Sequence, residues 1–182
     1  KESGRDQIAV VYASGAIMPG DGFSGIQSEV YKKTIRDLQE DDKVKAVVLR
    51  INSPGGSADA SEEILFELRQ LRKLKPIIVS FGDVAASGGY YIAMEADEIY
   101  TSPNTITGSI GVLGMIPSVK KLINNVGITT DYVKTNENSD FLKTIFNPMN
   151  DTQMGVMTEM TESVYKQFVT HVSNARKMSY KE

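Results

Sequence analysis

Cysteine is absent from this 182-residue sequence, and histidine occurs once, as His171. Without cysteine the chain has no disulfide, no thiolate metal ligand and no cysteine nucleophile. A single histidine excludes metal sites built from several histidines and leaves one candidate base for a Ser-His-Asp triad. Because His171 lies in a C-terminal helical pattern with Val164, Phe168 and Val172, we expect it to be an ordinary helix residue.

Long apolar runs and a strong charge imbalance are also missing. No stretch approaches the roughly 20 apolar residues of a membrane span. The net charge of -3 argues against a nucleic-acid partner. The length fits one domain with a good core, so we expect a single domain over residues 1–182. Because the sequence starts with Lys1 rather than Met, we also expect it to be a piece of a longer chain.

Alternating strand and helix patterns predict an α/β fold with a mostly parallel sheet of βαβ units. Short apolar runs predict strands at 7–12, 45–51, 77–80, 98–101 and 129–133. Amphipathic patterns predict helices at 28–40, 58–73, 119–125 and 151–177, and a buried apolar run predicts one more at 90–94.

Ser87 is the main candidate for a functional residue in this sequence. It lies between Ala85-Ala86 and Gly88-Gly89, where a predicted strand gives way to a predicted helix. Small neighbours let a peptide backbone approach closely, and the first N–H groups of a helix favour negative charge. The same position also suits a helix N-cap, so two interpretations are open: a nucleophile or a capping residue.

Two other loops belong to the same region. Ligands of parallel α/β folds bind at the carboxyl ends of the strands, and the segments 53–56, 85–89 and 107–109 are expected there. The backbone N–H groups of Gly56 and Gly88 could form a two-donor oxyanion hole. No phosphate-binding glycine motif is present, and this chemistry needs no cofactor.

A serine nucleophile needs a base, and with histidine scarce a lysine is the alternative. The lysine must be neutral, so burial has to lower its pKa from ~10.4 by roughly three units, about 4 kcal/mol. The hydroxyl of Ser109 is placed to orient such an amine.

Three segments, 52–56, 82–91 and 103–111, resemble peptidase family S49, the family of signal peptide peptidase A (protease IV). The resemblance implies a ClpP/crotonase-like fold and a serine endopeptidase that degrades signal peptides with a Ser–Lys dyad. It also implies a role for each candidate residue: Ser87 as nucleophile, Gly56 and Gly88 as the oxyanion hole, and Ser109 as the hydroxyl that positions the lysine.

The family has a short form, with both dyad residues in one domain, and a long form of two halves. The opening segment 8–17 resembles the second half of the long form, so the lysine is expected from the preceding half of the same protein. Lys143 is the alternative, if extra residues are placed in the loop before it. The resemblance further implies apolar signal-peptide remnants as substrates, a homo-oligomer, and a parent protein anchored in the cytoplasmic membrane of the cell envelope with this domain facing outward.

Three other interpretations are open. A crotonase-like acyl-CoA enzyme would share the fold and the oxyanion hole but would need no serine. A non-catalytic domain would scaffold an assembly or bind peptides. A Ser-His-Asp protease like ClpP would need His171 beside Ser87.

Overall fold

The computed structural model describes residues 6–131, 133–137, 139–141 and 145–180. The chain divides into two compact units, residues 1–111 with 167–182, and residues 112–166. One long helix, α5 (Asp151–Arg176), contributes residues to both units.

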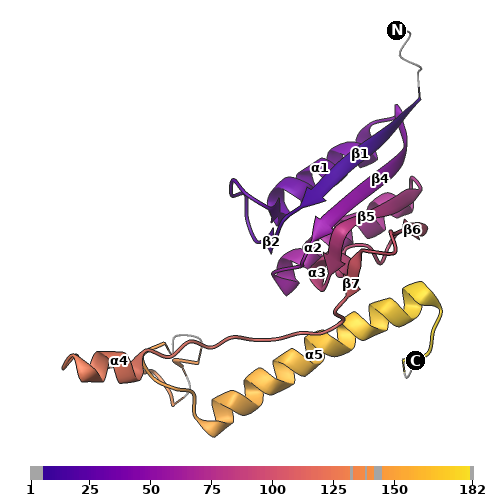
Figure 1. Ribbon diagram of the computed structural model, residues 1–182. Helices are drawn as coiled ribbons and strands as arrows, with labels where there is room; N and C mark the ends of the chain where they lie inside the picture. The colour runs from indigo at the N-terminus through magenta and orange to yellow at the C-terminus, as the bar shows by residue number, and fades with distance from the viewer. Residues whose placement is uncertain (1–5, 132, 138, 142–144, 181–182) are drawn as a thin grey trace. The chain divides into compact units, whose positions relative to one another are not determined.

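The first unit is built on a parallel β-sheet (Figure 1). The strand order is β1-β4-β5-β6, and β7 also pairs with β5. The sheet strands are β1 (Gln7–Ser14), β4 (Val44–Ser53), β5 (Ile77–Ala86), β6 (Glu98–Tyr100) and β7 (Ile106–Gly108). The short strands β2 (Ile17–Met18) and β3 (Ile26–Gln27) form a separate parallel pair, and the helices are α1 (Ser28–Glu40), α2 (Ala58–Arg72) and α3 (Gly88–Tyr91).

Helices α1 and α2 cover one face of this sheet (Figure 1), and the apolar core lies between these helices and the sheet. On β4, Val47, Leu49 and Ile51 alternate with more exposed residues, as expected for side chains that point to opposite faces of a strand. On α2 the buried residues follow helical spacing: Ile64, Leu65, Leu68 and Leu71. The helix begins at a Ser57 N-cap, whose side chain accepts a hydrogen bond from the Ala60 N–H.

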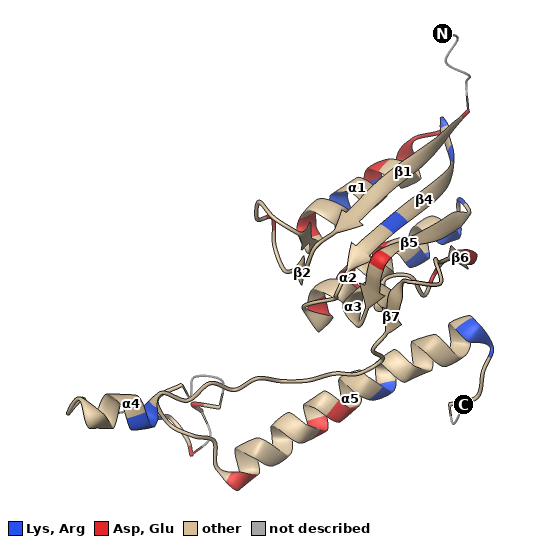
Figure 2. Ribbon diagram, viewed as in Figure 1, with Lys and Arg blue, Asp and Glu red and all other residues tan. Residues whose placement is uncertain are grey.

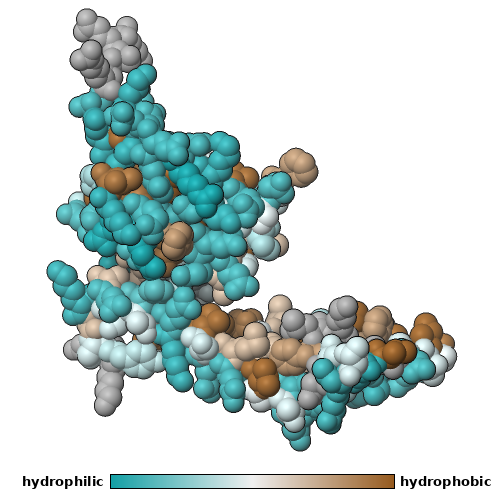
Figure 3. All heavy atoms as spheres, turned by 180° about the vertical axis from the view of Figure 1, so that it is seen from behind, coloured by the Kyte–Doolittle hydropathy of each residue, from teal (hydrophilic) through white to brown (hydrophobic). Residues whose placement is uncertain are grey.

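The second unit buries little of its own surface. Its helical parts are α4 (Lys120–Asn125) and the first turns of α5, and Gln153 is the one buried side chain among its described residues. Leu113, Met115 and Leu122 are exposed apolar residues of this unit, which shows extensive brown surface in Figure 3. The described residues of the apolar core therefore all lie in the first unit.

Charges of both signs are interspersed along α1 and α2 (Figure 2). Lys32 bonds Glu29 on α1 and Glu63 on α2, and the nearly buried Glu67 carboxylate is paired with Arg36. Two of these ion pairs, Lys32–Glu63 and Arg36–Glu67, link α1 to α2. No helix in the described part of the chain is long and apolar enough to cross a membrane.

The predicted strands and helices of the first unit are mostly confirmed, and their predicted bounds differ from the structure in three places. The strand predicted at 77–80 runs on to Ala86, because its second half gains β7 as a partner. The predicted loop at 107–109 is correspondingly part of β7 up to Gly108. The helix expected at 90–94 is the single turn 88–91, since the N–H groups of Ala93 and Met94 bond carbonyls three residues back.

In the second unit, the expected strand at 129–133 is not found among its described residues, 129–131 and 133. Ile128, just before this segment, and Val133 within it are exposed, so neither a strand nor the core among the described residues covers them.

The core of the first unit yields a stability prediction with a matched control. Leu65 on α2 has no exposed surface, whereas its neighbour Phe66 is 51% exposed. We expect Leu65→Ala to lower the free energy of unfolding by about 2–5 kcal/mol, because it removes packing contacts and leaves a cavity. Phe66→Ala should change it by less than about 1 kcal/mol. Urea denaturation of both variants tests this, and equal losses would contradict the assigned face of α2.

Candidate active site

Ser87 has an unusual backbone conformation, with φ 51° and ψ -122°. A non-glycine residue with positive φ is uncommon and is maintained only where the surrounding structure holds it. Two hydrogen bonds do so: the Ser87 N–H donates to the Gly108 carbonyl over 2.9 Å, and the Tyr91 N–H donates to the Ser87 carbonyl over 2.8 Å. Ser87 occupies the N-cap position of α3, but its side chain makes no capping hydrogen bond.

The loop after β4 packs directly on this turn. A methyl group added at Gly55 would lie 2.6 Å from the Gly88 nitrogen and 2.9 Å from the Ala86 carbonyl oxygen, and Gly55 itself has a φ of +99°. A methyl group at Gly88 would lie 2.6 Å from Ser61 Oγ on α2. The approach of the two loops therefore requires glycine at Gly55, whereas at Gly88 a methyl group would collide with the Ser61 side chain.

Gly56 presents its N–H away from the neighbouring strand. Ile17 pairs with Gly56 as an isolated parallel bridge, in which the Ile17 N–H donates to the Gly55 carbonyl and the Ser57 N–H donates to the Ile17 carbonyl, each over 2.9 Å. In a parallel bridge these two bonds come from the flanking residues, so the Gly56 N–H faces the other side. Within the described chain, neither this N–H nor that of Gly88 donates to a protein acceptor. Both are thus candidate donors to an oxyanion.

Ser109 directly follows β7, the strand whose Gly108 carbonyl accepts the Ser87 N–H. On β7, Thr107 pairs with Ala85 and Gly108 pairs with Ala86, and Thr107 Oγ1 donates to the Ala85 carbonyl over 2.8 Å. Ser109 comes next, exposed and with a φ of 50°. The structure therefore brings the segments of Ser87, Gly88, Gly56 and Ser109 to the carboxyl ends of β5, β4 and β7, while their roles stay predictions.

Two residues that shape the loop after β4 were missed by the sequence reasoning. Asn52 Oδ1 accepts the Val84 N–H over 3.0 Å, at the point where the β4–β5 register shifts. The buried Ser53 Oγ accepts the Gly55 N–H over 3.1 Å and so fixes the tight turn. The signal was available, because both are polar residues at the end of an apolar strand.

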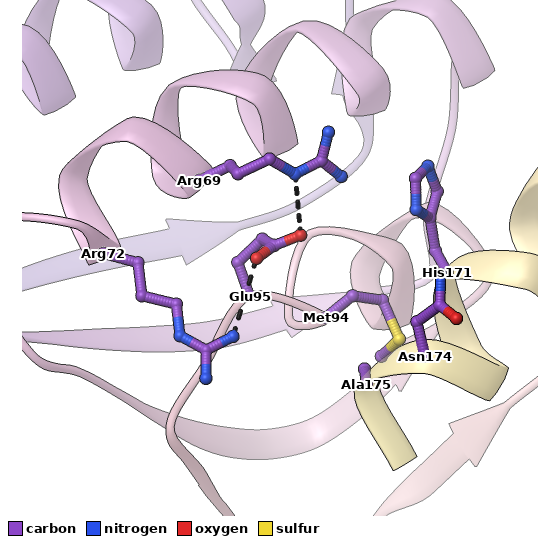
Figure 4. A pocket seen from close by; sticks show the side chains of 7 residues that line it. All are labelled: Arg69, Arg72, Met94, Glu95, His171, Asn174 and Ala175. Atoms are coloured by element: carbon purple, nitrogen blue, oxygen red, sulfur yellow. Dashed lines mark hydrogen bonds and ion pairs between the residues drawn. The ribbon is translucent and has the colours of Figure 1, made fainter. Parts of the chain in front are cut away.

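His171 is not placed beside Ser87. It lies on α5 with its ring edge-on to Tyr91, 5.5 Å between ring centroids, and its Nε2 is 3.7 Å from Glu62 Oε2. It lines a pocket whose other residues are Arg69, Arg72, Met94, Glu95, Asn174 and Ala175, none of them from the three loops (Figure 4). Because the neighbours of His171 do not include Ser87, the structure gives no support to a ClpP-like Ser-His-Asp triad.

The other candidate base, Lys143, lies outside the described residues. Within the described chain no group of three or more His, Cys, Asp or Glu residues could hold a metal ion.

Comparison with known proteins shows that this chain is similar to proteases. The sequence matches the model of peptidase family S49 over residues 69–182 and the Clp protease model over residues 2–107. It is 44% identical to Protease 4 of Salmonella typhi and 40% identical to Protease 4 of Haemophilus influenzae, covering 93% and 96% of this chain. It is also 35% identical to the chloroplastic serine protease SPPA of Arabidopsis thaliana, over 96% of this chain. The chain spans 27–28% of the length of these relatives.

Among solved structures, the chain is similar to a ClpP1 mutant from Listeria monocytogenes, with a TM-score of 0.57 at 16% sequence identity. The match covers 95% of this chain and 75% of the other. The expected ClpP-like α/β fold with a mostly parallel sheet is therefore confirmed.

The contact between the two glycine loops yields a second prediction. Gly55→Ala should be strongly destabilising, because it combines a strained φ with a collision against the backbone of Gly88 and Ala86. Gly20→Ala is the matched control, since Gly20 has a φ of +89° but no atom within 4 Å of an added methyl group. We expect the melting temperature to fall clearly further for Gly55→Ala. Equal effects would mean that only the backbone conformation matters.

Proposed function

Because the chain belongs to peptidase family S49, we propose that it carries the nucleophile of a serine endopeptidase, and that this nucleophile is Ser87. The backbone of Ser87 supports the assignment most directly. Its strained conformation is held from both sides by hydrogen bonds, while its hydroxyl makes no capping bond. A turn of this kind keeps a serine hydroxyl at the surface between strand and helix.

In the proposed reaction Ser87 Oγ attacks the substrate carbonyl carbon, and its proton passes to a base. The carbonyl oxygen becomes an oxyanion that accepts hydrogen bonds from the N–H groups of Gly56 and Gly88. The tetrahedral intermediate then expels the amine, which takes a proton from the base, and water hydrolyses the acyl-enzyme. Loss of one such donor typically costs about 10²–10³ in rate.

We assign the base to a neutral lysine from the preceding half of the same protein, oriented by the hydroxyl of Ser109. The resemblance of the segment 8–17 to the second half of the long form supports this. So does the chain's share of 28% of the Protease 4 relatives, which leaves most of their length outside the match. Lys143 is the alternative base.

The substrate class and setting follow the same proposal. Ala85, Ala86, Gly88 and Gly89 flank the nucleophile, so the site suits small side chains near the cleaved bond. We therefore propose apolar remnants of cleaved signal peptides as substrates. The working protein would be a homo-oligomer of the cell envelope, anchored in the cytoplasmic membrane with this domain facing outward.

The nucleophile is tested by Ser87→Ala in the intact protein, with Ser102→Ala as control because Ser102 is an exposed serine outside the three loops. We expect Ser87→Ala to abolish cleavage of a fluorogenic peptide and labelling by a serine-directed phosphonate, at an unchanged melting temperature. The control should keep both. Activity of Ser87→Ala within tenfold of wild type would instead favour a crotonase-like enzyme, which needs no hydroxyl. A wild-type protein that neither cleaves nor is labelled would favour a non-catalytic scaffold or peptide-binding domain.

The source of the base is tested by mixing. We expect this chain alone to cleave a peptide ester very slowly, and addition of the purified preceding half to restore turnover. The restored rate should rise with pH, because the lysine acts only after it loses its proton. Lys143→Met should leave the reconstituted rate nearly unchanged. If this chain alone works at the parent rate and Lys143→Met abolishes it, the base is Lys143.

A further inference from the structure

Behind Ser87, away from the three loops, lies a polar contact that the proposed reaction does not use. It joins Tyr91 at the end of α3 to Glu62 on α2, through a hydrogen bond from the Tyr91 hydroxyl to Glu62 Oε2. We propose that Tyr91 and Glu62 are positioning residues, which hold the Ser87 turn in its reactive conformation. The inference rests on Ser87 being the nucleophile.

Tyr91 is bound to the Ser87 turn through its own backbone. Its N–H donates to the Ser87 carbonyl over 2.8 Å, and this bond closes the single turn of α3. The other end of the residue, the hydroxyl, is tied to Glu62. Tyr91 is 7% exposed, so it links the nucleophile to α2 through the interior of the first unit.

Helix α2 supports α3 with two consecutive residues. Ser61 is 1% exposed, and its Oγ lies 2.6 Å from the position of a methyl group on Gly88, at the start of α3. Glu62 holds Tyr91, at the end of α3. Because α3 has only four residues, these two contacts fix both of its ends.

Helix α5 covers the remaining side of the tyrosine. The Tyr91 ring meets Phe168 edge-on at 4.8 Å and His171 edge-on at 5.5 Å between centroids. His171 Nε2 is buried without a hydrogen-bond partner in the described chain, 3.7 Å from the same Glu62 oxygen that Tyr91 bonds. The tyrosine ring therefore has little freedom to turn, and its hydroxyl keeps Glu62 as acceptor.

The charge environment keeps this hydrogen bond in place. Burial, and then the hydrogen bond to the Glu62 carboxylate, raise the pKa of the Tyr91 phenol above its ordinary value, although Arg69 and Gln167 act in the opposite direction. The phenol thus remains a donor at every pH at which the enzyme would be assayed.

Small displacements of a nucleophile are expensive, since a shift of about 1 Å can lower a rate on the order of 10²-fold. Ser87 is prone to such a shift, because its positive φ is a strained state that relaxes unless its neighbours hold it. Loss of the Tyr91–Glu62 bond frees α3 at one end only. We therefore expect a slower chemical step rather than an unfolded protein.

The test measures kcat, KM and melting temperature of the intact protein on a fluorogenic peptide. Tyr91→Phe and Glu62→Ala should each lower kcat about tenfold with KM within twofold, and the double variant should be no slower than either single variant. Glu62→Gln should restore most of the rate, because its amide oxygen still accepts the bond. Tyr100→Phe is the matched control, since Tyr100 donates to Glu98 on the exposed strand β6, and it should leave kcat unchanged.

A melting temperature that falls while kcat per folded molecule stays at the wild-type value would overturn the inference, because the pair would then be structural only. Additive losses in the double variant would also overturn it. The proposed function fails separately: it is wrong if Ser87→Ala keeps its activity. If Ser87→Ala is inactive while Tyr91→Phe and Glu62→Ala are fully active, only the positioning role is wrong.

Discussion

The close approach of Gly55 to Gly88 is the constraint on which the rest of the site depends. It brings the end of β4 against the turn after β5 with no room for a methyl group on either residue. The loop geometry on both sides follows from it: the Ser53 hydroxyl tightens one loop, and the positive φ of Ser87 bends the other. A side chain at Gly55 would separate the two backbones that carry the candidate oxyanion donors.

The proposed chemistry accordingly relies more on backbone than on side chains. One hydroxyl, two N–H groups and a lysine are enough for the reaction, and both N–H groups belong to glycines. The parallel sheet supplies the frame, since β5 pairs with β4 on one side and with β7 on the other. Asn52 and Tyr91 hold the backbone around these groups, since Asn52 Oδ1 accepts the Val84 N–H and the Tyr91 N–H donates to the Ser87 carbonyl.

The sequence was sufficient for the fold class, because apolar periodicity and strand–helix alternation depend on local pattern. It also predicted which loops would meet, since parallel strands end at the same edge of a sheet. It did not predict that β5 continues to Ala86, because that half of the strand is extended only by pairing with β7. The hydrogen bond between Tyr91 and Glu62 was also missed, because the two residues are 29 positions apart in the sequence and meet only through the tertiary fold.

The order in which these segments occur along the chain has a consequence for folding during synthesis. The strands and loops that shape the Ser87 turn lie between Ile17 and Ser109, so they can associate before the second unit has been made. Phe168 and His171, which pack on Tyr91, are added only with the last turns of α5. The nascent chain can thus form the Ser87 turn early and pack Phe168 and His171 against Tyr91 only after α5 has been synthesised.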